Sequence, residues 1–257
     1  MQTSVKIMDI DVDMISNDVF IQKINDYLTN EKLQVIFFAS TEMLNRATQK
    51  AEYRELVEMA ELFLPGEEAL LSAHHGEVLE AGDMVVSCRS FGLALEKLKK
   101  ENRTIYIVSK SDPDVELLVS YCKEMQPELK IVGSCAYSDG MDDVAIVNEI
   151  NSHVPDFLLV DLEVGVQEQW IMDHVSLLNA KLCVAIGGVA GLILSRQKKT
   201  PEWVERFHMG ELYRKMVKEQ YVKKGLRARI FRKKVVQYNN MTEEERGKSK
   251  NNFSEMR

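Results

Sequence analysis

The chain has 257 residues, of which 45% are hydrophobic and 28% charged, with 13 Gly and five Pro. This composition supplies a full core for one large α/β domain or two smaller lobes, and it excludes collagen-like and low-complexity proteins. The net charge of −7 is unevenly distributed: residues 196–235 carry 14 Lys and Arg against four Asp and Glu, a net charge of +10, whereas residues 1–195 carry −17.

The sequence lacks the segments that direct a chain into or across a membrane. No apolar run approaches the roughly 18 residues that span a bilayer, and the amino terminus has neither the basic nor the apolar region of a secretory signal. The four cysteines are widely spaced, without a C-x-x-C pair, which favours buried reduced thiols. We therefore expect a cytoplasmic location.

Taken in chain order, short apolar runs alternate with segments of helical periodicity. Predicted strands cover residues 4–12, 34–39, 62–64, 104–108, 130–134, 157–162 and 182–186. Predicted helices cover residues 16–28, 42–59, 85–100, 113–125, 142–153 and 167–178, with a helical turn at 69–75. Strands and helices that alternate at this spacing are typical of βαβ units. The sequence therefore predicts an α/β domain over residues 1–195, with a mostly parallel sheet of Rossmann-like units.

A basic helical appendage is predicted after this domain, over residues 196–235. Its apolar residues recur at steps of three to five and are interleaved with Lys and Arg, as in an amphipathic helix. Through residues 211–235 such a helix would lie on an anionic membrane or dock to a protein partner. A nucleic-acid arm is disfavoured, because aromatic stacking residues are sparse and the rest of the chain is acidic. Residues 236–257 are polar and expected to form a disordered tail.

The stretch FLLVDLEVGVQEQW, residues 157–170, places polar residues after a buried strand. Ligands of α/β folds bind at the carboxyl ends of the strands, so this stretch predicts part of a binding site. Asp161 and Glu163 are two residues apart and would share a face if the strand persisted. An anionic ligand would favour glycines there. Three alternatives stay open: the acids hold a bridging cation, they mark a site that no longer takes such a ligand, or they are simply solvated.

Several short motifs occur in an order that resembles one known family. They are Leu64-Pro65, the block ending in Lys130-Ile131-Val132-Gly133, Gln167-Glu168 with Trp170-Ile171, Gly187-Gly188, Pro201 with Trp203, and Leu212-Tyr213-Arg214. From residue 38 to about residue 223, the chain resembles the WecG/TagA/CpsF family. The resemblance implies a bacterial inverting glycosyltransferase. Such an enzyme moves an N-acetylhexosamine-type sugar from a UDP donor to a lipid-linked acceptor, at the cytoplasmic face of the membrane, in cell-surface polysaccharide assembly.

The resemblance also implies which residues bind the substrates. They are Ser40, Glu42, Gln167, Glu168, Gly187, Gly188 and Arg214, with Asp161 and Glu163 where the family has glycines. Arg214 is expected to reach the donor diphosphate. The family's catalytic Asp corresponds to Gly66, so Glu67 is expected to replace it as the base that takes the proton of the acceptor hydroxyl. Alternatively, Glu67 and Glu68 cap the helix that follows.

Two other functions stay open beside the transferase. One is a non-catalytic relative that serves as a binding or regulatory partner in a polysaccharide biosynthesis complex. The other is a new reaction carried out by Glu67, Asp161 and Glu163 as clustered acids. No cofactor is expected, although a divalent metal at Asp161 and Glu163 stays open, as does a homo-oligomer. The adjacent His74-His75 pair predicts an exposed turn rather than a metal site.

Overall fold

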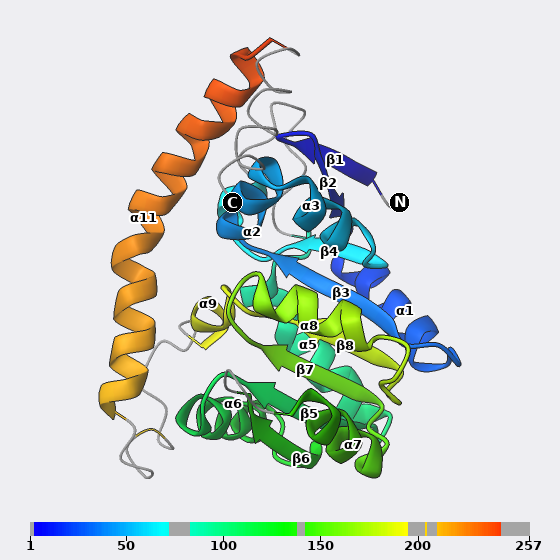
Figure 1. Cartoon of the computed structure of the whole chain (residues 1–257). Helices are drawn as coiled ribbons and strands as arrows, with labels where there is room; N and C mark the ends of the chain where they lie inside the picture. Colours follow the sequence, from blue (N-terminus) through cyan, green and yellow to red (C-terminus); the bar gives the residue numbers. More distant parts are fainter. Residues whose placement is uncertain (1–2, 72–82, 138–141, 195–203, 205–209, 243–257) are drawn as a thin grey trace.

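The centre of the fold is a six-stranded parallel sheet. The computed structural model describes residues 3–71, 83–137, 142–194, 204 and 210–242 (Figure 1). The strands of this sheet are β3 (Gln34–Ala39), β4 (Leu62–Pro65), β5 (Thr104–Ser109), β6 (Lys130–Ala136), β7 (Phe157–Asp161) and β8 (Leu182–Ala185). They lie in the order β4-β3-β8-β7-β5-β6. The predicted α/β fold with a parallel sheet is therefore confirmed.

Helices cover both faces of the sheet. One face packs against α1 (Asn17–Leu28), α5 (Ser87–Lys100), α6 (Asp112–Met125) and α9 (Ala190–Leu194). The other packs against α2 (Thr41–Gln49), α3 (Ala51–Glu58), α4 (Glu68–Leu71), α7 (Asp143–His153) and α8 (Val166–His174). Strand β3 shows why both faces are apolar: Val35 and Phe37 enter one core, and Ile36 and Phe38 the other. Alternation along each buried strand thus builds two cores around one sheet.

The amino terminus forms a β-hairpin rather than the single strand expected at residues 4–12. Strands β1 (Thr3–Ile7) and β2 (Ile10–Met14) pair antiparallel, with Ile7 opposite Ile10. The two turn residues, Met8 and Asp9, have φ angles of 51° and 62°. A two-residue turn that follows the twist of its strands requires positive φ at both positions. The turn was not predicted because neither of its two residues is glycine.

Several helix boundaries also differ from the prediction. The segment 42–59 is two helices, because Lys50 is extended, with φ −126° and ψ 112°. The helix expected at 167–178 ends at His174, and α9 was not predicted. The helix expected at 113–125 begins at Asp112, and Ser111 caps it: the Ser111 Oγ accepts a hydrogen bond from the Asp114 N–H at 3.3 Å. Hydrophobic periodicity predicts that a helix exists, but it does not determine the residues at which the helix begins and ends.

Residues 210–235 of the basic appendage belong to α11 (Gly210–Asn240), a helix of 31 residues. In Figure 1 it stands on the side toward which the strand arrows point. Phe231, Val235 and Tyr238 are buried in the core of the body. The helix continues five residues past the boundary expected at 235, so the disorder expected from 236 is wrong for residues 236–240. Among the described residues, no helix is both long and apolar enough to cross a membrane.

Candidate functional site

A cleft of about 180 Å³ lies where β3, β4 and β8 end. It is lined by Ser40, Thr41, Glu42, Asn45, Glu67, Gly188, Arg227, Ile230 and Phe231. The chain leaves β3 through α2 on one face of the sheet, and it leaves the neighbouring β8 through α9 on the other face. Such a divergence is a topological switch point, the place where open α/β sheets bind their ligands. The position of the cleft therefore makes it the candidate active site.

Glu67 follows β4 and reaches the amino terminus of α2. Its Oε1 accepts hydrogen bonds from the backbone N–H of Thr41 at 2.8 Å and from the Thr41 hydroxyl at 3.1 Å. Ser40 caps the same helix, because its Oγ accepts from the Met43 N–H at 3.1 Å. The first N–H groups of a helix attract negative charge. The carboxylate is thus held in one place, half-buried at the wall of the cleft.

Gly66 has no room for a side chain. Its N–H donates to the Ala39 carbonyl oxygen at 2.8 Å. A Cβ at this position would lie 2.5 Å from that oxygen and 2.7 Å from Val189 Cγ1. An aspartate at 66 would therefore require β3 and β4 to move apart. The next residue, Glu67, places its carboxylate in the lining of the cleft.

Gln167 and Glu168 lie beneath the site and do not line the cleft. Both are fully buried. Gln167 Oε1 accepts from the Gly187 N–H at 2.8 Å, and Glu168 Oε2 accepts from the Gly165 N–H at 2.5 Å. Burial raises the pKa of the Glu168 carboxyl, while the hydrogen bonds from Gln167 and Gly165 oppose that rise. In this conformation the pair supports the loop at Gly187 and would not contact a ligand in the cleft.

Gly188 brings this loop into the cleft wall. Its φ of 82° is a conformation that L side chains rarely adopt. A Cβ at this residue would also lie 2.9 Å from Val164 Cγ2 and 3.1 Å from Ser40 Oγ. The backbone of the loop therefore approaches α2 closely, and only glycine fits without strain. Of the Gly187-Gly188 pair, Gly188 lines the cleft and Gly187 is bound to Gln167 behind it.

Asp161 and Glu163 do not share a face, because β7 ends at Asp161. Asp161 is 2% exposed, and the Ser109 hydroxyl donates to its Oδ2 at 3.1 Å, whereas Glu163 is exposed. Burial raises the pKa of Asp161 to about 6, against the lowering effects of Lys110 and Ser109. Strand β7 is three strands from β4, roughly 14 Å at about 4.8 Å per strand. Asp161 and Glu163 were expected to cluster with Glu67. Only Glu67 of the three lines the cleft.

Arg227 lines the cleft, although the sequence had not indicated it as a site residue. It extends from α11, together with Ile230 and Phe231. The spacing could have indicated it, because Arg227 lies four residues before the apolar Phe231 and residues four apart share a helix face. In the structure Phe231 is 1% exposed, so this face of α11 lies against the body. Arg214 was expected in this role. It belongs to α11, but its side chain lies outside the described part of the chain.

Metal binding gains no support from the described ranges. Within them, no three His, Cys, Asp or Glu side chains come close enough to hold an ion. Of the two acids considered for a cation, Asp161 accepts a hydrogen bond from the Ser109 hydroxyl and Glu163 is exposed. His74 and His75 lie outside the described residues.

The fold is a doubly wound α/β fold with a cleft at a topological switch point, the position where such folds bind ligands. Residues 5–233 match the model of the Glycosyl transferase WecG/TagA/CpsF family, and the chain belongs to this family. Similar proteins include N-acetylglucosaminyldiphosphoundecaprenol N-acetyl-beta-D-mannosaminyltransferases from Staphylococcus aureus strains NCTC 8325 / PS 47, COL and MSSA476. Each is 20% identical over 215 residues, which cover 83% of this chain and 84% of the relative.

Proposed function

We propose that the protein transfers an N-acetylhexosamine, of the N-acetylmannosamine type, from a UDP donor to a lipid-linked diphosphate sugar in cell-surface polysaccharide synthesis. The observation that carries this proposal is the position of Glu67. Its carboxylate is fixed at the amino terminus of α2, inside a switch-point cleft that Arg227 also lines. The family match covers both residues, and the names of the relatives supply the class of sugar and acceptor.

In this proposal Glu67 is the general base. It accepts the proton of the acceptor hydroxyl, whose oxygen attacks the anomeric carbon of the donor sugar. The bond from that carbon to the diphosphate breaks, and its electron pair leaves with UDP. General bases contribute about 10²–10⁴-fold to such steps. Arg227 is the candidate cation for the charge that develops on the diphosphate, because a guanidinium binds phosphate oxygens in pairs.

The acceptor is lipid-linked, so we also propose that α11 rests on the cytoplasmic face of an anionic membrane. Leu226, Ile230 and Val236 expose 61%, 47% and 46% of their surface, beside exposed Arg229 and Lys233. Each basic residue near an anionic surface contributes about 1 kcal/mol of attraction. The exposed apolar side chains add the burial of hydrocarbon to this attraction.

A second candidate is a non-catalytic relative that binds a partner in the same pathway. The closed backbone at Gly66 favours it, because the family's catalytic Asp has no place there. The hydrogen bonds that Thr41 donates to the Glu67 carboxylate also favour the non-catalytic relative. A general base has to accept a proton, and these bonds occupy one of its oxygens. The two candidates make opposite predictions about turnover.

The deciding experiment incubates the purified chain with a panel of UDP-N-acetylhexosamines and a short-chain prenyl-diphosphate N-acetylglucosamine. Mass spectrometry detects the disaccharide product, and calorimetry measures UDP binding in parallel. The transferase predicts a product from at least one donor. UDP binding without any product supports the non-catalytic relative. Neither binding nor product would show that this cleft is not a nucleotide-sugar site.

A further inference from the structure

The carboxyl-terminal turns of α11 are bonded to the turn of the β-hairpin. The Tyr238 hydroxyl donates to Asp9 Oδ2 at 2.8 Å, and Tyr238 is only 6% exposed. The guanidinium of Arg54, in α3, donates to the Asp9 carbonyl oxygen at 2.5 Å. Asp9 therefore joins α3, the hairpin and α11 at one point. The family match covers residues 5–233, so Asp9 and Arg54 lie within it and Tyr238 lies beyond its end.

The same end of α11 determines where Arg227 lies. Phe231, Val235 and Tyr238 form one buried stripe, and Arg227 lies four residues before Phe231 on that side of the helix. From Arg227 to Tyr238 is 11 residues, about 16 Å of continuous helix. Because a helix of this kind moves as one element, an anchor at Tyr238 limits both its rotation and its distance from the cleft. Closer to the cleft, Lys234 Nζ donates to Asn45 Oδ1 at 3.2 Å.

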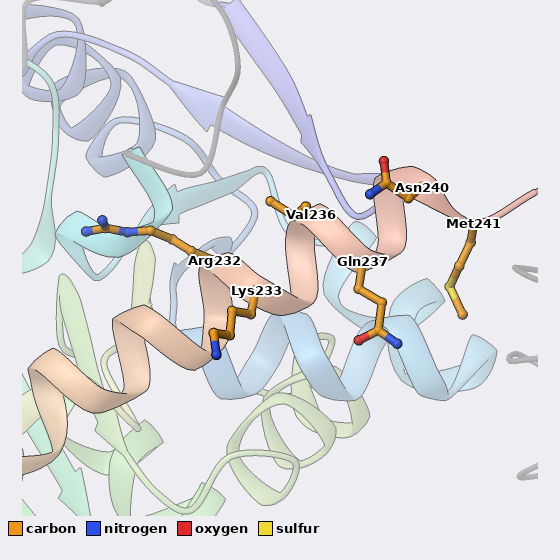
Figure 2. Close-up of a pocket in the computed structure, with 6 residues that line it drawn as sticks. All are labelled: Arg232, Lys233, Val236, Gln237, Asn240 and Met241. Carbon is orange, nitrogen blue, oxygen red and sulfur yellow. The ribbon is translucent and has the colours of Figure 1, made fainter.

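Packing does not surround this part of the helix on every side. A shallow hollow that is open to solvent runs along one side of this segment and is bordered by Arg232, Lys233, Val236, Gln237, Asn240 and Met241. Figure 2 shows Lys233, Gln237 and Met241 extending to the same side of the helix. These residues lie off the buried stripe of Phe231, Val235 and Tyr238. This side of the helix faces solvent, and the bond to Asp9 helps to hold the opposite side against the body.

We propose that Asp9 and Tyr238 form a latch that positions Arg227 over the cleft. Neither residue lines the cleft, so both are positioning residues for the donor diphosphate. The inference rests on the proposed function, since it assigns Arg227 to the donor. It adds that the chain beyond the family match, together with the amino-terminal hairpin, sets the affinity of the site.

Three substitutions test the latch in the full chain. Asp9→Gly removes the acceptor and keeps a residue that tolerates the positive φ, whereas Asp9→Asn keeps both an acceptor and that tolerance. Tyr238→Phe removes only the donor. Loss of one such hydrogen bond changes an equilibrium by about fivefold. We expect Asp9→Gly and Tyr238→Phe to speed hydrogen exchange in residues 231–240 by about this factor and to weaken UDP binding similarly, with Asp9→Asn close to the parent.

Arg227→Ala provides the matched background. With Arg227 absent, Tyr238→Phe should no longer change UDP affinity, although it should still speed exchange in α11. An equal loss of affinity with and without Arg227 would overturn the positioning role, and unchanged exchange in Asp9→Gly and Tyr238→Phe would overturn the latch itself. A parent chain that binds no UDP would refute the proposed function, and the positioning role with it, whereas the exchange data would still report whether the hairpin holds α11.

Discussion

Replacing Asp161 with Asn is expected to stabilise the protein, and to do so only above acidic pH. Asp161 ends β7 at 2% exposure, and burial raises its pKa from the ordinary 3.8 to about 6. The folded state therefore binds the Asp161 proton more tightly than the unfolded state does. The stability that this proton contributes is fully present below about pH 4 and is lost as the pH rises through about 6.

The size of the effect follows from the two pKa values. Each factor of ten in proton affinity corresponds to about 1.36 kcal/mol, so the interval from 3.8 to about 6 gives about 3 kcal/mol. Asn has nearly the shape of Asp and carries no charge to desolvate. Its amide oxygen can still accept the hydrogen bond that the Ser109 hydroxyl donates at 3.1 Å. We expect Asp161→Asn to raise the free energy of unfolding by up to about 3 kcal/mol at pH 8, and by much less near pH 4.

Urea unfolding between pH 4 and pH 8 measures this difference, with circular dichroism as the signal. Glu55→Gln is the matched control, because Glu55 is exposed and is not among the groups that shift the pKa of Asp161, so its removal should leave the pH dependence of stability unchanged. The argument would be refuted if Asp161→Asn changed stability equally at every pH, or if it were less stable than the parent at pH 8.

Three further outcomes follow from the site and its helix. Gly66→Ala should lower the free energy of unfolding by about 1–3 kcal/mol, because the new Cβ would overlap the Ala39 carbonyl oxygen. Gly92→Ala is the control, because its Cβ would meet only Met125 Cε at 3.4 Å. Equal stability of the two variants would contradict the argument. Gln167→Ala should lower stability in urea by about 1–3 kcal/mol, because it leaves the buried Gly187 N–H unbonded; a variant as stable as the parent, like the exposed control Gln169→Ala, would count against that role. The double change Leu226→Ser with Ile230→Ser should weaken sedimentation with anionic vesicles, and the parent should detach as salt rises. Parent protein that ignores anionic vesicles at low salt would exclude the membrane proposal.

The sheet was predictable because its strands are buried on both faces. Continuous apolar runs such as residues 34–39 and 157–162 are what a fully covered parallel sheet requires. Ser40, Glu67 and Gly188 follow such strands and line the cleft, since parallel strands end at one edge of the sheet. The hairpin turn at Met8 and Asp9 was not predictable, because the turn contains no glycine and Met8 is not a usual residue of a two-residue turn.

The positions of several side chains depend on packing between residues far apart in the chain, and the sequence did not predict these positions. Whether Gln167 faces a ligand or the core depends on Gly187, which lies 20 residues away in the chain. The assumption that Asp161 and Glu163 share a face failed because the strand stops at the first of them. The roles of Arg227 and Tyr238 depend on how α11 lies on the body, and that docking involves Asp9, 229 residues from Tyr238. No local pattern reports such contacts.

The central claim is that Glu67 is the base of a sugar transfer in the cleft at the ends of β3, β4 and β8. The most direct test measures turnover and UDP affinity together in the parent, in Glu67→Gln and in Glu68→Gln. Gln at 67 can still accept the hydrogen bonds from Thr41, and Glu68 is an exposed neighbour that does not line the cleft. We predict that Glu67→Gln lowers kcat by about 10²–10⁴-fold while UDP affinity stays within about threefold, and that Glu68→Gln leaves both unchanged. A Glu67→Gln variant that transfers sugar at the parent rate would contradict the account.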